Sequence, residues 1–387
     1  MKATKFFAMA LAALTLFSCS KENNIENPIP ADQKATLKLS LTGKGGQTKA
    51  TGATTQDVAV NDLIAFVFRA DGSLDALPKY MTAAEITAAS GNVEIAISKG
   101  AAEVYVVANT GELATSPVKG VTNKASLLTK VGDLANGTAT TQDKDNLWMV
   151  GKENVDWTDA ELGKATVALS FVAAKVEFVV DLTALTNTTD NCGYIDIKDV
   201  VLLYAGREAK FFGTAAQQAT QAKWYSGDVS YPNIDVPEDG VNMVQKDFLV
   251  QSVTFNGGGA MTTVNPHFYT FPNDGAAKPT ILALRGTRNE KDEDGDMVEK
   301  TYYWPIQFSA ADAQSTLEAG KSYTVTIKLK GDTTYQGDGD GSPDSGNGGG
   351  NSGGTEDPET EIVPADVEVS ITPAAWVPVP TIEKGFE

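Results

Sequence analysis

The chain has 387 residues, with 31 Lys and Arg against 50 Asp and Glu, and its formal net charge is -19. That balance excludes nucleic-acid binding by phosphate neutralisation, because such binding needs an excess of basic side chains. The length predicts two domains with substantial buried cores.

The first residues predict an export signal. Lys2 and Lys5 precede an apolar run from Phe6 to Phe17, and Cys19 follows directly after a small residue. The apolar run is shorter than the roughly 20 residues that a membrane-spanning helix needs. We therefore predict a lipoprotein signal peptide over residues 1–19, with lipidation of Cys19 and sorting to the outer membrane.

Cysteine usage leaves no internal disulfide once Cys19 carries lipid, since Cys192 is the only other cysteine. The fold must then be stabilised by packing alone. Apolar residues recur with period two from residue 36 onward, beginning with Leu37, Leu39 and Leu41 on one face of a strand. This period predicts an all-β protein.

The strand pattern predicts two β-sandwich domains, at residues 50–160 and 161–330, after a segment at 20–49 that holds the first strand. Short helices are expected only at 82–89 and after Ser309. The strands of the first domain are expected at 63–68, 93–97 and 104–108. Those of the second are expected at 165–169, 174–180, 195–204, 249–255, 268–271, 280–284, 302–308 and 322–329.

A different composition begins at Gly331. Residues 331–360 are dominated by Gly, Asp, Ser and Asn, which predicts a flexible linker. In residues 361–387, Val367, Val369 and Ile371 alternate with polar residues. Burying these three side chains would contribute about 5 to 9 kcal/mol before ordering costs, so the strand must dock. It can pair with its own domain or with the next molecule.

The order of several motifs resembles the fimbrillin family, the major fimbrium (type V pilus) subunits. No single motif is specific, and their shared order carries the resemblance. They are the lipobox, the Gly-Gly-Gln-Thr-Lys-Ala segment at 45–50, the strand at 104–111, Phe-Phe-Gly at 211–213, the segments at 268–273 and 279–282, Tyr-Tyr-Trp-Pro at 302–305, the segment at 320–327, and the last strand with Ala375-Trp376-Val377.

The resemblance implies two transthyretin-like, Greek-key β-sandwiches and assembly by strand exchange. A protease would remove the strand that carries Leu37, Leu39 and Leu41, and a neighbour's tail would fill the same groove. The donor residues are then Val367, Val369, Ile371, Trp376, Val377 and Val379. Both strands present alternating aliphatic residues, so we expect them to be interchangeable occupants of one groove.

The cleavage point departs from the family pattern, which uses an arginine-specific protease. The matching segment offers Lys49 before Ala50, with Lys44 as a second candidate, and the first arginine is Arg69 at the end of a core strand. We predict cleavage between Lys49 and Ala50. The segment 1–49 holds seven Lys and three Asp or Glu, so cleavage would change the formal charge from -19 to -23.

The implied function is structural: a subunit of the cell-surface fimbrial shaft with a role in adhesion, no cofactor and no catalytic residue. Its partners would be other copies of itself, anchor and tip subunits, the maturation protease, and host or bacterial surface receptors. A monomeric surface glycan-binding lipoprotein built on the same two sandwiches is the alternative, and deleting the tail separates the two.

Three other groups of residues are candidate functional sites, and each is better explained by a structural role. His267 is the only histidine, so it has no partner for a catalytic triad or a zinc site. The acidic residues Asp292, Asp294, Asp296 and Glu299 surround Gly295, which favours a solvated hairpin turn over a calcium loop. A sugar could stack on tryptophan side chains only if they shared one face of the protein. For Trp157, Trp224 and Trp304, positions in the core are the simpler interpretation.

Overall fold

A computed structural model describes residues 34–43, 60–89, 92–135, 147–157, 161–186, 193–213, 221–228, 243–308, 316–332, 356 and 367–375. The structure is mostly β-strand, at 60%, with only 6% helix, which confirms the all-β prediction. The finer transthyretin-like, Greek-key assignment stays a prediction. Among the described residues, no helix is long and apolar enough to cross a membrane.

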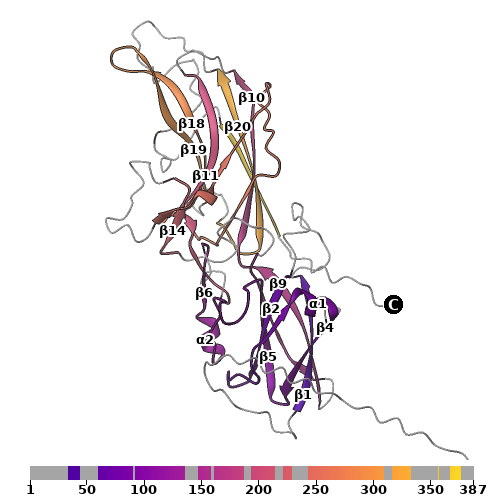
Figure 1. Ribbon diagram of the computed structural model, residues 1–387. Helices are drawn as coiled ribbons and strands as arrows, with labels where there is room; N and C mark the ends of the chain where they lie inside the picture. The colour runs from indigo at the N-terminus through magenta and orange to yellow at the C-terminus, as the bar shows by residue number, and fades with distance from the viewer. Residues whose placement is uncertain are drawn as a thin grey trace, which may run out of the picture.

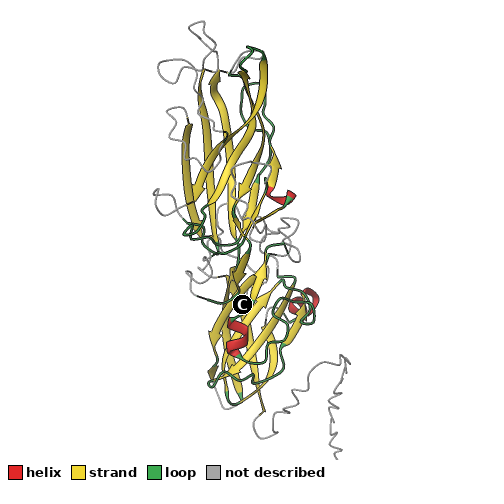
Figure 2. Cartoon of the chain, turned by 90° about the vertical axis from the view of Figure 1, so that its left-hand side faces the viewer, coloured by secondary structure: helices red, strands yellow, loops and turns green. Residues whose placement is uncertain are grey.

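Two groups of strands stand one above the other in Figure 1, and the turned view in Figure 2 keeps them separate. The lower group contains β1 (Lys34–Gly43), β2 (Asp62–Arg69), β3 (Lys79–Thr82), β4 (Asn92–Ser98), β5 (Ala101–Ala108), β7 (Met149–Asn154), β8 (Asp156–Trp157) and β9 (Leu162–Phe171), with helices α1 (Ala83–Ala88) and α2 (Lys124–Leu128).

The upper group contains the remaining strands: β10 (Ala174–Thr186), β11 (Ile195–Leu203), β12 (Ala205–Gly206), β13 (Glu208–Lys210), β14 (Trp224–Ser226), β15 (Met243–Gln245), β16 (Val250–Ser252), β17 (His267–Thr270), β18 (Thr280–Lys291), β19 (Met297–Phe308), β20 (Lys321–Asp332) and β21 (Val367–Ala375). β6 (Val131–Asp133) reaches up from the lower group. A 3-10 turn, η5 (Asp247–Leu249), precedes β16.

The lower group is one sheet with the strand order β3-β2-β5-β7-β9-β1-β4, and β8 pairs with β9. Every second residue of β9 is buried, and the central residues of β2 are buried on both faces. The short helix α1 begins with a capping box, in which the Thr82 hydroxyl accepts from the Glu85 N–H and the Glu85 carboxylate accepts from the Thr82 N–H. The helix expected at 82–89 is therefore present.

The strand at 162–171 corrects our division of the chain. We placed residues 165–169 in the second domain, but β9 pairs with β1, β7 and β8 of the lower group. The alternating pattern of β9 would suit either group, because periodicity identifies a strand and not the sheet that it joins. Only the buried residues Val172 and Ala173 separate β9 from β10 of the upper group.

The upper group contains two four-stranded sheets, β17-β10-β20-β21 and β16-β11-β18-β19, and a three-stranded sheet, β12-β14-β15. An ion-pair network links Asp228, which follows β14 of the three-stranded sheet, to β11 and β18. Arg285 donates to both carboxylate oxygens of Asp199, at 2.8 and 2.7 Å, and to Asp228 at 2.5 Å, which also accepts from the Tyr303 hydroxyl at 2.8 Å. A bidentate pair of this kind fixes the guanidinium geometry.

The two groups are joined by a second connection besides the chain itself. β6 pairs with β13 of the upper group. The Asp133 carboxylate accepts from Arg207 Nε at 3.0 Å and from the Tyr225 hydroxyl at 2.7 Å. Burial, together with the hydrogen bond to Asp133, raises the pKa of the Tyr225 phenol. The phenol therefore stays protonated and keeps donating across the junction.

Aromatic side chains fill the junction below that ion pair. Trp148 lies 5.2 Å from the Phe211 ring and 6.0 Å from the Phe271 ring, and Tyr105 meets Phe212 edge to face at 5.0 Å. A Cβ on Gly132 of β6 would come within 2.1 Å of the Trp148 ring. The junction thus depends on a glycine where the backbone meets an indole.

Gly132→Ala should therefore loosen the junction, since neither the indole nor the paired β6 backbone has room for a methyl group. We expect the free energy of unfolding to fall by about 1–3 kcal/mol in denaturant titrations. Gly257→Ala is the control, because a Cβ there would meet nothing within 4 Å, and it should stay within about 0.5 kcal/mol of the parent. Equal stability of the two variants would contradict this account of the junction.

Candidate functional site

The first strand, β1, lies between two strands of opposite direction. It pairs antiparallel with β4 from Lys34↔Ser98 to Ser40↔Asn92, and parallel with β9 from Thr36↔Leu162 to Gly43↔Leu169. We call the space between β4 and β9 the β1 slot. An occupant of this slot has a backbone partner on each side.

The inward face of β1 is part of the core of the lower group. Leu37 and Leu39 are fully buried, and Leu41 is 8% exposed, so the predicted alternation is present. Gly163 of β9 lies opposite Leu37, and a Cβ at Gly163 would come within 2.7 Å of Val155, so the packing beside the slot leaves no room for a side chain there. Emptying the slot would expose a row of aliphatic pockets.

β4 depends on β1 for its place in the sheet, because β1 is its only strand partner among the described residues. A buried carboxylate provides a second attachment at one end. Asp75 accepts from the Ser98 N–H at 2.6 Å, from the Ser98 hydroxyl and from Arg69 Nε at 2.9 Å. Asp75 is 4% exposed, and its own N–H donates to Val67 of β2. β4 is thus tied to β2 independently of β1.

The last described strand, β21, lies in the upper group and pairs with β20 of its own chain. The pairing is antiparallel, from Lys321↔Ala375 to Leu329↔Val367. Ile371 lies opposite Val325 and Val369 opposite Ile327, and both β20 residues are fully buried. Among the described strands, β21 lies at the edge of its sheet, with β20 as its one backbone partner.

Within one chain the first and last strands lie in different sheets. The expectation that one groove accepts either strand concerns the tail of a neighbouring copy, and it stays a prediction. Of the two docking possibilities left open for the tail, the structure contains pairing with its own domain. Aliphatic alternation alone could not distinguish these positions, because both strands would suit either edge or slot.

Several predicted residues lie outside the described part of the chain: Cys19, Lys44, Lys49, Ala50 and Cys192, the helix after Ser309, Trp376, Val377 and Val379, and nearly all of the linker. The acidic residues at 292–296 form the turn between β18 and β19, where the Asp292 carboxylate accepts from the N–H groups of Asp294 and Asp296. That is the expected hairpin.

The other candidates are dispersed. His267 begins β17, and its ring lies 4.8 Å from the Tyr269 ring. Trp304 is buried in β19, Trp157 donates from β8 to the Ala101 carbonyl, and Trp224 lies on β14. The three tryptophans belong to three different sheets, so they do not share a platform for a sugar.

The Asp75–Ser98 contact was not predicted from the sequence. The two residues are far apart in the chain and belong to no motif, and Asp75 follows the turn at Asp71-Gly72, where acidic residues are ordinarily solvated. The contact joins the loop after β2 to the end of β4, and tertiary packing alone brings these segments together. The signal that a sequence could offer is a conserved acid at this position, which one chain cannot display.

Family models match the chain in two parts. The model described as FimA-like major fimbrial subunit protein, C-terminal domain, matches residues 173–376, and that for the major fimbrial subunit protein (FimA) matches residues 35–162. The interval between the matches, residues 163–172, covers β9 after its first residue and ends at Val172, just before β10. The major fimbrium subunit FimA type-3 of Porphyromonas gingivalis is 22% identical over 303 residues, which are 76% of this chain and 75% of the relative.

Solved structures agree with this similarity. A candidate cell adhesion protein from Bacteroides eggerthii is 34% identical, with a TM-score of 0.71 over 90% of this chain and 98% of the other. One from Parabacteroides distasonis, at 16% identity and a TM-score of 0.55, covers 89% of this chain and 99% of the other, and shows the fold alone.

Asp75→Asn should weaken the attachment of β4, because an amide can no longer accept from all three donors as a carboxylate does. We expect a loss of about 2 kcal/mol in the free energy of unfolding, with faster hydrogen exchange of the amides at 93–98. The exposed Ala96→Ser on the same strand is the control, expected within about 0.5 kcal/mol. Unchanged exchange in Asp75→Asn would show that β4 does not depend on this contact.

Proposed function

Because the chain belongs to the FimA-like major fimbrial subunit family, we propose that it polymerises by strand exchange after proteolytic removal of β1. The family consists of fimbrial structural subunits, which agrees with the prediction that the chain is not an enzyme. In the proposed exchange, β21 leaves β20 of its own chain and enters the β1 slot of the next copy.

One observation carries the proposal: in the described part of the chain β1 has two strand partners, whereas β21 has one. A strand that moves from the edge beside β20 into the slot between β4 and β9 would gain a second ladder of hydrogen bonds. It would also cover the pockets vacated by the leucines of β1. Both gains favour exchange once the slot is empty, since unpaired backbone groups and exposed apolar surface are costly.

The length of the connection to β21 supports the same direction of transfer. Antiparallel neighbours such as β20 and β21 need a turn of only 2–5 residues, yet residues 333–366 join them. A Gly-rich chain of this length has an r.m.s. span of roughly 30 Å. The connection is therefore long enough for β21 to reach another molecule, a reach that pairing with β20 does not require.

Maturation would begin at the lipidated precursor. Removal of residues 1–49, by cleavage between Lys49 and Ala50 or earlier at Lys44, would detach both the Cys19 anchor and β1. Arg69 is a poor cleavage point, because it ends β2, whose side chains fill the core. The cut would leave the sheet intact except for the vacant slot.

A cell-surface fimbrium is the expected location, in keeping with the relatives. In this assembly the chain would be a shaft subunit, since it has both a removable strand and a donor strand. Anchor and tip subunits, a maturation protease, and host or bacterial surface receptors complete the proposed set of partners. The dispersed tryptophans offer no support for the glycan-binding alternative.

Val369→Asp should abolish polymerisation, because the inward position opposite the buried Ile327 is apolar in β20 and in the slot alike. The test uses full chain with a protease site inserted after Lys49, cut after folding, and followed by gel analysis of stable oligomers. Ser370→Asp is the matched control, since Ser370 is exposed on the outward face, and its ladder should persist. A normal ladder from Val369→Asp would refute strand exchange through β21.

Polymerisation should be faster at higher ionic strength. Cleavage leaves a formal charge of -23, and residues 331–387 hold twelve Asp or Glu against one lysine, so the donor tail and the acceptor repel each other. Salt screens such repulsion beyond about 8–10 Å. Oligomer formation followed between 20 mM and 500 mM sodium chloride should accelerate several-fold, and slower assembly in salt would contradict this view.

A further inference from the structure

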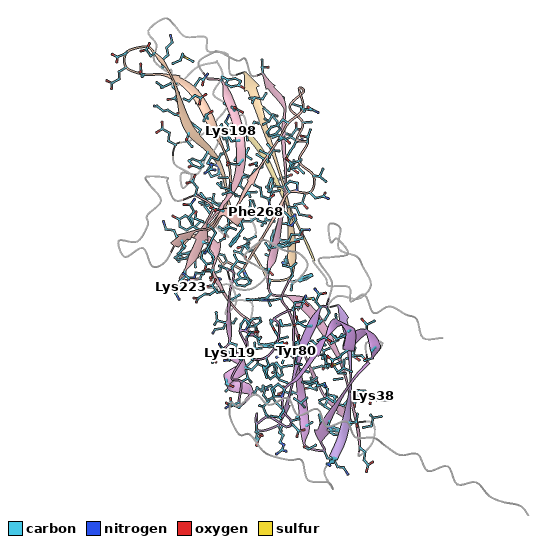
Figure 3. All side chains as sticks on the ribbon, viewed as in Figure 1. Lys38, Tyr80, Lys119, Lys198, Lys223 and Phe268 are labelled. Carbon is cyan, nitrogen blue, oxygen red and sulfur yellow. The ribbon has the colours of Figure 1, made fainter. Side chains whose placement is uncertain are left out.

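Four charged residues form a row across the outward face of the lower sheet at the β1 slot. Asp156 of β8 lies opposite Lys164 of β9, Lys164 lies opposite Lys38 of β1, and Lys38 lies opposite Glu94 of β4. All four side chains are exposed, and Figure 3 places Lys38 at the outer margin of the lower group. Directly opposed side chains on adjacent strands are close enough to attract or repel.

We propose that this row is a charge selector for the occupant of the slot. Glu94 and Asp156 favour the basic Lys38 and so retain β1 in the uncut chain, while Lys164 favours an acidic residue at the same position. In the donor, Glu368 stands between the apolar residues Val367 and Val369. The partner is a second copy of this chain, and the inference rests on the strand exchange proposed above.

The direction of the incoming strand decides which donor residue meets the selector. The backbone does not choose, because either direction gives the occupant one parallel and one antiparallel neighbour. If the donor runs in the same direction as β1 and its apolar residues take the places of the β1 leucines, Val367 replaces Leu37 and Glu368 replaces Lys38. In the reverse direction Ser370 would occupy position 38, and Glu368 would lie at position 40 beside Thr166.

The position of β21 in its own chain shows the same preference. Glu368 lies opposite Lys328 of β20, between inward pairs at Ile327 and Leu329. Lys164 of β9 likewise stands between the buried Gly163 and Ala165. Glu368 therefore lies opposite a lysine, Lys328, in its own chain. If β21 entered the slot in the direction of β1, Glu368 would again lie opposite a lysine, Lys164.

The selector also explains a difference between the two occupants. The row is taken in the order Asp156, Lys164, slot occupant, Glu94. With Lys38 as the occupant, the charges are negative, positive, positive and negative, and they sum to zero. With Glu368 the row reads negative, positive, negative, negative, so Lys164 is the only residue in the row that attracts the donor. The row thus favours the original strand before cleavage, and the acidic donor afterwards depends on Lys164 to offset the repulsion from Glu94.

The test uses full chain with the protease site after Lys49, in a Lys38→Ser background that removes the charge of β1 itself. At low ionic strength, Lys164→Glu should slow oligomer formation about two- to tenfold, and Glu94→Lys should speed it by a similar factor. Both effects should shrink in 500 mM salt. Melting temperatures of the uncut variants verify that each one folds.

Charge reversal on the donor completes the test. Adding Glu368→Lys to Lys164→Glu should restore at least the parental rate, because the new lysine would face Glu94 as well as the new glutamate, whereas adding Ser370→Lys should not. Restoration by Ser370→Lys alone would overturn the proposal, since it would place the strand in the reverse direction. Equal rates in all variants would likewise overturn it, while absence of any ladder in the cut parent would instead refute strand exchange itself.

Discussion

The β1 slot is the constraint on which the rest of the molecule depends. Its occupant pairs antiparallel with β4 and parallel with β9, and its inward side chains complete the core of the lower group. β4 has no other strand partner among the described residues, so the slot also decides whether that strand stays in the sheet. The Asp75 carboxylate attaches β4 to β2 and preserves the far wall of the slot when β1 is absent.

The two ends of the chain differ in how firmly they are held. β1 lies inside a sheet, whereas β21 lies at an edge and is joined to β20 by residues 333–366. Between these ends the molecule is continuous: β9 leads into β10 through two buried residues, and β6 pairs with β13 beside the Asp133–Arg207 ion pair. A strand held at an edge is thus combined with a body whose two strand groups are fastened together at more than one point.

Sequence periodicity predicted most of the strands, including β1 and β21, because a half-buried strand must alternate. It did not predict partners. The strand at 162–171 was placed in the wrong group, and the tail was not placed on β20, since a pattern of Val and Ile records burial and not the neighbour that provides it. The Asp75–Ser98 contact and the charge row at Lys38 were missed for a related reason: both depend on contacts between segments far apart in the sequence.

The geometry of the slot bears on how a fibre would respond to tension. A strand seated between β4 and β9 has hydrogen bonds running across its axis on both sides, so a pull along that axis loads the two ladders in shear. The bonds must then yield together, whereas a strand peeled from one end gives way one bond at a time. An occupant of the slot would therefore resist lengthwise stretching far better than a strand lying at the rim beside β20.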